Sequence, residues 1–565
     1  MNEFIFGELA SWEYRARLLT EKRRGVSHRS KLDPYCPTPA DEPVLTVRVE
    51  LDSPVERVIC TVLEPAEGEV ELERVATEWD LLNWTYFHHW QCRLPAQPEG
   101  TLVRYKIHAY PEMEGTVVPA DEDIYFSYLV GSPAPPEWSK EAIVYQIFPD
   151  RFHPGQDRAW NQVSRPDEIY GGTLRGIIER LDYIADLGFN CLWLNPIFPD
   201  STHHGYHATD YFSINPRLGT MDDLHELVAG AHDRGIRMVL DFVANHWGRD
   251  HATFLDAQAD QNSPYFDWYH WIEWPEKYEA YFGIPALPKL NVNNRELRTH
   301  LHEAAEFWLL EGNFDGLRLD HAQGVTLDFW TEFRKEVKAM KPDTWMFGEV
   351  TDSPARQIDF SGRLDGCLDF MLNQALRDVF AFETLSLSRF NTFLDNHTAF
   401  FPADFSRPAF LDNHDMDRFL HIGRNDPRKV KLAALCLFTL SGPPIVYYGT
   451  EVGVRQEHSV KGPGSRGLPE ARQAMVWGEE QDHDLHGFFR RLIHLRRDHP
   501  VLVSGVRKTV HLDDRLGTLA YTRSSGTDQA LVLINRSAET RKIMVGGHSY
   551  DLPPCSGDVH ISSTV

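Results

Sequence analysis

Apolar and polar residues follow two alternating patterns through the middle of the chain. Short, continuous apolar runs are typical of buried parallel strands, and they alternate with segments whose apolar residues recur every three or four positions, as in helices. The helical segments cover 173–188, 221–235 and 296–312. The apolar runs predict eight strands, over 142–150, 189–195, 236–243, 314–320, 344–350, 366–372, 407–415 and 443–449. This pattern predicts an α/β fold, a (βα)8 TIM barrel rather than an open sheet.

Both ends of the chain have a different pattern. Short alternating runs separated by Pro, Glu and Gly predict an N-terminal β-sandwich domain over residues 1–130. Three prolines within 131–138 predict a stiff linker. We expect the barrel domain over 139–497, and short strands after it predict a small C-terminal β domain over 498–565.

One connection of the predicted barrel is much longer than the others. About 50 residues rich in Trp, Tyr and Pro follow the third strand, and we expect an inserted domain at about 247–292. The aromatic residues of 265–283 have two interpretations. They line a sugar site, because pyranose faces pack on aromatic rings, or they form the small core of the inserted domain.

Composition and charge narrow the classes of function. The 565-residue chain is 42% apolar and 12% aromatic, as in globular proteins of two to four domains. Its net charge of −26 repels phosphate backbones and anionic lipids, which disfavours nucleic acid and membranes as partners but not a neutral substrate. Seven scattered cysteines without a CxxC pair indicate reduced thiols. The first residues do not resemble a secretion signal, so we expect a cytoplasmic protein.

Polar side chains gather at the carboxyl ends of the predicted barrel strands, where enzymes of this fold place their active sites. They are Tyr206 after the second strand, Asp241, Asn245 and His246 after the third, Arg318 and Asp320 after the fourth, Glu349 at the fifth, and His414 and Asp415 at the seventh. Asp241 and Asn245 also have a structural interpretation, as braces of Arg318 and of the loop after the third strand. Three of the group, Asp320, Glu349 and Asp415, are carboxylates expected to face one pocket.

Arg318 and Asp320 lie two residues apart on a strand, so their side chains point to the same face. A single Arg-x-Asp pair is more often a structural ion pair, but carboxylates at other strand ends favour a site. Crowded carboxylates raise one another's pKa, so that one stays protonated while another is ionised. Glycoside cleavage requires such an acid and nucleophile, and Arg318 is expected to keep Asp320 ionised and oriented.

These residues belong to short motifs with a known counterpart. In their order and spacing, DFVANH (241–246), GLRLD (316–320), GEV (348–350) and FLDNHD (410–415) resemble the four short motifs of the α-amylase family of glycoside hydrolases. GFNCLWLNPIF, LPKLN and GPPIVYYGTE resemble its secondary motifs. The resemblance covers roughly 139–480, and it implies a barrel whose long excursion is the family's B domain, together with a retaining mechanism.

The resemblance also implies roles for single residues. Asp320 matches the nucleophile, Glu349 the acid/base and Asp415 the transition-state stabiliser. Tyr206 matches the ring that stacks on the sugar of the cleaved subsite, and His246 and His414 match histidines that contact that sugar. Arg318 matches the nucleophile's partner. Together with Asp241, these are the residues expected to bind substrate.

Within the family, the N-terminal β domain and LPKLN are similar to the neopullulanase, cyclomaltodextrinase and maltogenic amylase branch. Members of that branch are often dimeric through this domain, which implies a possible homodimer. The chain departs from the branch at Gln323 and Gly324, where the branch has Asn-Glu, and at Thr351, where it usually has an aromatic residue. The runs HPGQDRAW and YGGTL lack the oxygen ligands of calcium-binding relatives, so no metal or other cofactor is expected.

The sequence thus predicts a retaining hydrolase of α-1,4-glucosidic bonds in short or cyclic maltooligosaccharides. The nearest alternative is an α-glucosidase or glucosyl transferase of the same family, because a sugar can intercept the glycosyl enzyme in place of water. A more distant alternative is a glucan-binding or scaffold protein without catalysis. The HHW run at 88–90 has a structural interpretation and, as its alternative, a metal site.

Overall fold

The computed structural model describes residue 16 and residues 25–51, 54–112, 116–155, 158–462 and 464–563. The cytoplasmic expectation rests on the start of the chain, where residue 16 alone of the first 24 is described. Residues 156 and 157 of the HPGQDRAW run also lie outside the described residues. The chain divides into two compact units. One comprises 1–134, 323–342 and 350–367, and the other 135–322, 343–349 and 368–565. The domain boundaries predicted from the sequence stay predictions.

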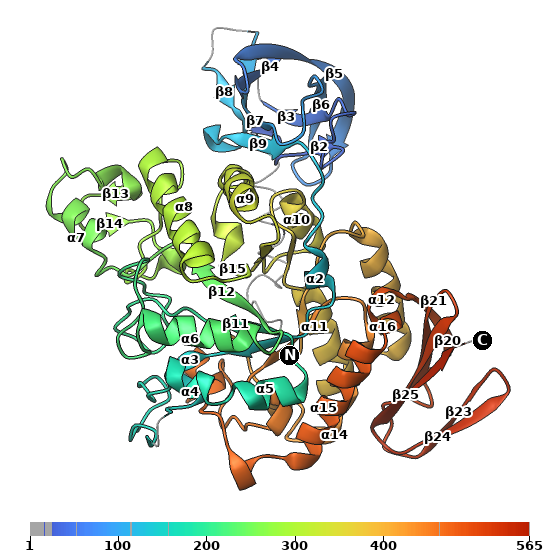
Figure 1. Cartoon of the computed structure of the whole chain (residues 1–565). Coiled ribbons are helices and arrows are strands. Elements are labelled where there is room, and N and C mark those ends of the chain that lie inside the picture. The colour runs from blue at the N-terminus through green and yellow to red at the C-terminus, as the bar shows by residue number, and fades with distance from the viewer. Residues whose placement is uncertain are drawn as a thin grey trace. The chain divides into compact units, whose positions relative to one another are not determined.

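The first unit contains a nine-stranded antiparallel sheet, drawn in blue in Figure 1. Its strands β1 to β9 span Gly25–Ser27, Leu32–Asp33, Val44–Glu50, Val55–Glu64, Gly68–Asp80, Thr85–Arg93, Leu102–Pro111, Val118–Pro119 and Phe126–Leu129. Alternate side chains of β3 and β7 are buried, and Val47 and Ile107 belong to one apolar core. The period-2 pattern of these segments therefore predicted the N-terminal antiparallel β structure correctly.

The same unit includes helix α9 (Leu327–Met340), which ion pairs tie to β7. Arg104 on β7 donates from Nε to Asp328, at 2.8 Å, and from Nη2 to Glu332, at 2.6 Å. In the HHW run, His88 bonds to Thr77 at 2.9 Å and Trp90 lies in the apolar core. These contacts favour the structural interpretation of that run.

Eight parallel strands form one curled sheet, which confirms the predicted (βα)8 barrel. They are β10 (Val144–Ile147), β11 (Cys191–Leu194), β12 (Arg237–Val243), β15 (Gly316–Asp320), β16 (Trp345–Gly348), β17 (Gly366–Cys367), β18 (Ala409–Phe410) and β19 (Pro444–Tyr447). The strand order is β17-β16-β15-β12-β11-β10-β19-β18. A hydrogen bond of 2.8 Å from Asp369 N–H to the Pro408 carbonyl joins the segments that follow β17 and precede β18.

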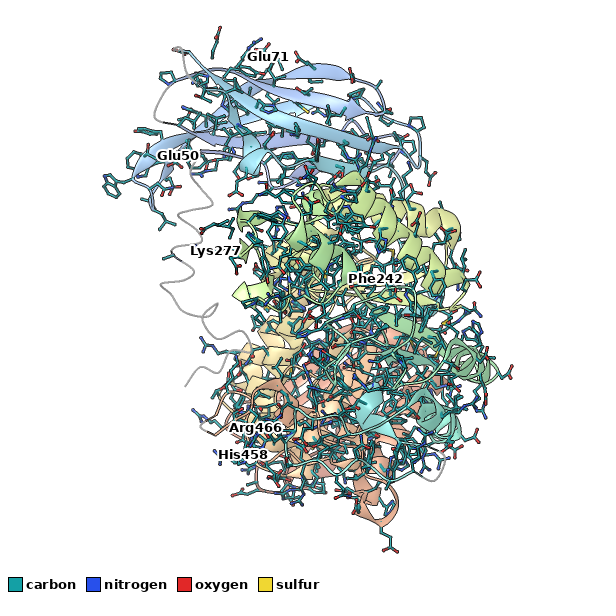
Figure 2. The ribbon with its side chains drawn as sticks, turned by 90° about the vertical axis from the view of Figure 1, so that its left-hand side faces the viewer. Glu50, Glu71, Phe242, Lys277, His458 and Arg466 are labelled. Atoms are coloured by element: carbon teal, nitrogen blue, oxygen red, sulfur yellow. The ribbon has the colours of Figure 1, made fainter. Side chains whose placement is uncertain are left out.

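Helices cover the barrel strands on their outer side, and a long excursion interrupts this alternation. The helices between and after the strands include α6 (Met221–His232), α8 (Arg295–Leu310), α14 (Pro427–Thr439) and α15 (His483–Asp498). The excursion between β12 and α8 contains α7 (Ala252–Ala259), β13 (Trp271–Glu273) and β14 (Lys277–Tyr278). Figure 2 shows Phe242 of β12 among packed side chains and Lys277 at the margin, in line with their burial and exposure.

The predicted helix over 173–188 is wrong in one respect, because the structure has two helices there. Helix α4 (Leu174–Ile178) and helix α5 (Leu181–Leu187) are separated at Arg180, whose backbone leaves the helical region. The Arg180 guanidinium lies 4.2 Å from the Trp477 ring centroid and contacts His153 at 2.8 Å. A tertiary cation-π contact thus accompanies the break in a continuous helical pattern.

The predicted strand over 366–372 is also largely wrong. Only Gly366–Cys367 is a strand, and helix α11 (Phe370–Leu376) begins three residues later. The Asp369 carboxylate accepts a hydrogen bond from Leu372 N–H and so acts as the N-cap of α11. The predicted strand over 407–415 is likewise only two residues long in the structure, Ala409–Phe410.

The C-terminal part forms a second antiparallel β structure, as predicted. Its strands are β20 (Val506–Asp513), β21 (Thr518–Ser525), β22 (Asp528–Asn535), β23 (Arg541–Val545), β24 (His548–Leu552) and β25 (Ser556–Ser563). Four of them pair in the order β20-β21-β22-β25, and β23 pairs with β24. Leu533, Ile543 and Leu552 contribute to one small apolar core.

Candidate active site

Arg318 lies at the centre of a buried cluster of charges at the carboxyl end of the barrel. Its side chain points inward from β15 and is fully buried. Nη1 donates to Asp241 Oδ1 at 2.7 Å and to Asp320 Oδ1 at 2.8 Å, and Nη2 lies 3.0 Å from Glu349 Oε2. One guanidinium therefore joins carboxylates from β12, β15 and the residue after β16.

Asp241 is the brace of this cluster. Its Oδ1 faces Arg318, while its Oδ2 accepts hydrogen bonds from Tyr206 Oη at 2.9 Å and from Trp193 Nε1 at 3.1 Å. Asn195 Nδ2 adds a longer contact of 3.3 Å to the same oxygen. With both oxygens used in this way, Asp241 serves to fix Arg318 and Tyr206, in agreement with its structural interpretation.

Glu349 is held against the end of β15 by its backbone and by one carboxylate oxygen. Its N–H donates to the Leu319 carbonyl at 2.8 Å, and its carbonyl accepts from Ala322 N–H at 3.0 Å. His321 N–H donates to Oε2 at 3.0 Å, the oxygen that also faces Arg318. Because Oε2 accepts a hydrogen bond from His321 N–H and lies beside the positive charge of Arg318, a proton on this carboxyl group belongs on Oε1.

A second network joins Tyr206, His414 and Asp415. Tyr206 Oη lies 2.7 Å from His414 Nε2, which in turn lies 3.0 Å from Asp415 Oδ2. The Tyr206 and His414 rings are parallel, with 5.6 Å between their centroids. Gln146 Nε2 lies 2.8 Å from His414 Nδ1, and because an amide nitrogen can only donate, the ring proton belongs on Nε2, facing Tyr206 and Asp415.

Arg472 is a member of the site that the sequence did not reveal. Its Nη2 donates to Asp415 Oδ1 at 2.8 Å, and its Nε donates to the His414 carbonyl at 2.8 Å. Arg472 follows no predicted strand, because it lies 25 positions after Tyr447, the last residue of β19. No motif or spacing in the sequence links this arginine to the carboxylates, so only the fold reveals its place in the site.

The three carboxylates of the Arg318 cluster bind protons more tightly than isolated carboxyl groups. Burial raises the pKa of Asp320 to about 7, and the charges of Asp241 and Asp415 add to the shift while Arg318 opposes it. Burial raises the pKa of Asp241 to about 6 in the same way, and it raises that of Glu349. These groups interact strongly, so they titrate as a set rather than one by one.

Asp415 is shifted in the opposite direction. Burial alone would raise its pKa, but His414 and Arg472 outweigh that effect and hold the pKa well below its ordinary value. Its side chain also keeps 32% of its exposure, against 9% for Asp320 and 11% for Glu349. Asp415 is therefore held in its ionised form on the more exposed side of the cluster, whereas burial favours the protonated forms of Asp320 and Glu349.

His246 contacts an aromatic residue of the excursion, Tyr281. Its buried ring stacks on Tyr281 with 4.5 Å between centroids. Burial raises the pKa of Tyr281, and the charges of Asp320, Glu349 and Asp415 raise it further. The centroid of the Tyr281 ring also lies 4.8 Å from that of His321, the residue after Asp320, so Tyr281 borders the site, and it belongs to the aromatic segment 265–283 for which the sequence left a sugar site open.

The aromatic residues of 265–283 divide between the two interpretations that the sequence left open. Trp268 and Tyr269 are buried and pack on Trp247, which supports a small core. Tyr281 and Phe282 lie at the other end of the segment, beside His246 and His321. This second group lies beside a predicted site residue, His246, and beside the residue that follows Asp320.

The structure brings the predicted site residues other than Asn245 and His246 into two networks, which Tyr206 connects. Asp241, Arg318 and Asp320 lie within their strands rather than after them, and each strand is buried along this part of its length. Gln323 and Thr351, where the chain departs from the related branch, are hydrogen-bonded to each other at 2.8 Å. Among the described residues, no cluster of three or more His, Cys, Asp or Glu side chains could hold a metal ion.

Comparison with known proteins agrees with this geometry. Residues 146–498 match the family described as "Alpha amylase, catalytic domain". The chain belongs to the α-amylase family of glycoside hydrolases. Members of this family are enzymes that cleave glycosidic bonds with retention of configuration.

Individual members of the α-amylase family resemble the chain over most of its length. "Alpha-amylase 2" of Dictyoglomus thermophilum is 33% identical over 99% of this chain and 96% of its own. A cyclomaltodextrinase from a Bacillus species is 35% identical over 77% of this chain and 80% of its own. A solved structure of a cyclomaltodextrinase is 31% identical with a TM-score of 0.69, and covers 92% of each chain.

This α-amylase family member is thus related to the cyclomaltodextrinases, as the resemblance of its motifs indicated. Within the part of the chain that the structure describes, no helix is both long and apolar enough to cross a membrane.

Proposed function

We propose that this enzyme hydrolyses α-1,4-glucosidic bonds in short or cyclic maltooligosaccharides, with Asp320 as nucleophile and Glu349 as acid/base. The observation that supports these roles is the shared guanidinium of Arg318. Asp320 and Glu349 each lie within 3.0 Å of it, which keeps the two carboxyl groups close together. Retaining glycosidases have their two carboxyl groups about 5–5.5 Å apart, too close for an intervening water.

The first step uses the oxygens that the protein leaves free. Oδ1 of Asp320 accepts from Arg318, so Oδ2 is the oxygen that attacks the anomeric carbon. The bond from that carbon to the glycosidic oxygen breaks as the bond to Oδ2 forms, and Glu349 gives its Oε1 proton to the leaving oxygen. Burial raises the pKa of Glu349, which favours the protonated form that this step requires.

The second step reverses these roles. A water molecule attacks the anomeric carbon, Glu349 accepts the water proton, and the ester bond to Asp320 breaks to release the sugar. Asp415, ionised because of His414 and Arg472, stabilises the positive charge that develops on the sugar in both transition states. Tyr206 and His414 form the parallel rings beside which this sugar is held.

The preference for cyclic substrates rests on the two cyclomaltodextrinases, whose name states a cyclic substrate, and the preference for short linear ones rests on the resemblance to the branch. We include in the proposal a cytoplasmic location, which is consistent with an intracellular maltogenic amylase of Bacillus subtilis that is 34% identical over 69% of this chain. A homodimer through the N-terminal β structure is also part of the proposal, on the resemblance to the branch alone.

A product profile tests this function. Purified protein is incubated with maltoheptaose, β-cyclodextrin, pullulan and maltose, beside the Asp320→Asn variant. We expect rapid cleavage of the cyclic and short linear sugars and loss of all cleavage in the variant. Glucose released only from linear chain ends would favour an α-glucosidase, and dominant transfer products a glucosyl transferase. A protein that binds these sugars without turnover would be a glucan-binding protein.

A further inference from the structure

A buried arginine outside the two networks of the site carries a charge that the reaction does not use. Arg151 lies in helix α3 (Pro149–Phe152), which follows β10, and its side chain is fully buried. Its Nε donates to Asp150 Oδ2 at 2.8 Å, and its guanidinium lies 3.8 Å from the centroid of the Tyr170 ring. Burying a cation is costly unless its donors are satisfied, so the remaining contacts of Arg151 indicate what the charge holds.

Further donors of Arg151 bind main-chain carbonyls from two loops. Nη2 donates to the carbonyls of Pro166, at 2.9 Å, and Glu168, at 2.8 Å. Nη1 donates to the Arg472 carbonyl at 2.9 Å, and the Arg151 carbonyl in turn accepts from Met475 N–H at 2.8 Å. The side chain and the main chain of Arg151 therefore both fix the backbone at Arg472 and Met475 against the segment that follows β10.

This stretch of backbone carries the arginine that holds Asp415. The Arg472 side chain reaches the His414 carbonyl through Nε and Asp415 Oδ1 through Nη2, both at 2.8 Å. The two contacts require one orientation of the Arg472 side chain, because the donors of a guanidinium lie in a rigid plane. A shift of the Arg472 backbone would therefore move the Nη2 donor away from Asp415.

We propose that Arg151 is a positioning residue for the proposed reaction, because it holds the Arg472 backbone so that the Arg472 guanidinium stays on Asp415. The inference rests on the proposed role of Asp415 in stabilising the transition state. A displacement of about 1 Å, even one that starts far from the reacting atoms, can cost 10²-fold in rate. An interaction realised in the transition state affects kcat rather than KM, so Arg151 should contribute mainly to kcat.

A double-mutant cycle on maltoheptaose tests this coupling. Arg151→Lys keeps the charge but replaces the planar group that binds three carbonyls by a single nitrogen. We expect it to lower kcat about 10- to 10²-fold, with KM within about twofold of wild type. Arg472→Lys should lower kcat at least as much. Adding Arg151→Lys to Arg472→Lys should change kcat less than about twofold further, because the contact that Arg151 positions is already lost.

The matched control is a second buried arginine that binds carbonyls away from the site. Arg496 on α15 is fully buried, and it donates to the carbonyls of Phe438, at 2.8 Å, and Gly442, at 2.9 Å. We expect Arg496→Lys to lower Tm, as Arg151→Lys does, but to leave kcat within about twofold of wild type. An equal loss of kcat in Arg496→Lys would show that any defect of this kind lowers the rate, and it would overturn the proposed role of Arg151.

A milder variant keeps the test decisive if Arg151→Lys does not fold. Tyr170→Leu removes the ring beside the guanidinium and leaves the carbonyl partners of Arg151 in place. We expect a kcat about two- to fivefold lower, the range of one cation-π contact, and no further loss in the Arg472→Lys background. Unchanged kcat in whichever of the two variants folds, or losses that multiply in the cycle, would overturn the positioning role. A wild-type protein that does not cleave maltoheptaose, or full activity of Asp415→Asn, would instead contradict the proposed function.

Discussion

The arrangement of single residues shows how one cation can organise three carboxylates. Arg318 offers a planar group with donors on two nitrogens, and Asp241, Asp320 and Glu349 each contact it within 3.0 Å. A lysine at this position has one nitrogen at the end of a flexible chain and cannot reproduce the geometry. The alternation of β15 predicted the pairing with Asp320, whereas the contacts to Asp241 and Glu349 depend on strands that only the fold brings together.

We therefore expect Arg318→Lys to lower kcat about 10² to 10³-fold, as the loss of an oriented donor does in other active sites. The measurement is kcat on maltoheptaose at saturating substrate. Arg428→Lys is the matched control, because Arg428 is an exposed arginine that pairs with Asp426. A decrease of similar size in both variants would show that the effect is not specific to the site.

The raised pKa of Asp320 predicts an unusual dependence of stability on pH. Its carboxyl group ionises at about pH 7 in the fold and near 3.9 in the unfolded chain. The stability contributed by the protonated form is thus present below about pH 4 and is lost as the pH rises through about 7. We expect Asp320→Asn to gain thermal stability relative to wild type between pH 5 and pH 8, measured as Tm.

Asp415→Asn provides the opposite case. The pKa of Asp415 is lowered in the fold, so its ionised form contributes stability that is fully present above about pH 4. This variant should be less stable than wild type by a similar amount at pH 5 and pH 8. A constant difference for Asp320→Asn over the same pH range would contradict the raised pKa of the nucleophile.

At the scale of secondary-structure elements, the long buried strands could be predicted and the short ones could not. β12 and β15 have continuous apolar runs, because helices or the barrel interior cover both of their faces. The run at 366–372 looks the same in sequence, yet Asp369 caps α11 in its middle. His397 Nε2 lies 2.9 Å from Asp369 Oδ2, a contact 28 positions away that no local pattern reveals.

The cap of α11 can be tested directly. Asp369→Ala removes the acceptor for Leu372 N–H and leaves the buried His397 without its carboxylate, and we expect a loss of about 2–4 kcal/mol of unfolding free energy. Asp369→Asn keeps an acceptor for the helix and should lose clearly less. Urea unfolding of the two variants and wild type measures these differences. Equal losses would indicate that charge, not capping, is what matters.

At the scale of the whole molecule, the net charge of −26 suits a neutral substrate. Charged ligands are steered by the field of a protein, and salt screens that effect, whereas an uncharged oligosaccharide experiences neither. The family, the barrel and the three carboxylates could be predicted from ordered motifs. Arg472 could not, because it enters the site from a loop whose course the sequence does not define, and Tyr281 could be predicted only as one of the aromatic residues of 265–283.

We accordingly expect kcat/KM for maltoheptaose to change less than twofold between 20 and 500 mM NaCl. The control is thermal stability over the same range, which shows whether salt affects the fold rather than binding. A steep decrease of kcat/KM at constant Tm would mean that an electrostatic attraction contributes to substrate capture.

The account depends most on the covalent bond between Asp320 and the sugar. The direct measurement is the intact mass and peptide map of Glu349→Gln after reaction with α-maltosyl fluoride, whose good leaving group lets the first step proceed while the missing base slows the second. We predict one added maltosyl group, located on the peptide that contains Asp320. A sugar attached to a different carboxylate, or full turnover of the fluoride through the variant without any attached sugar, would contradict the assignment of Asp320 as the nucleophile.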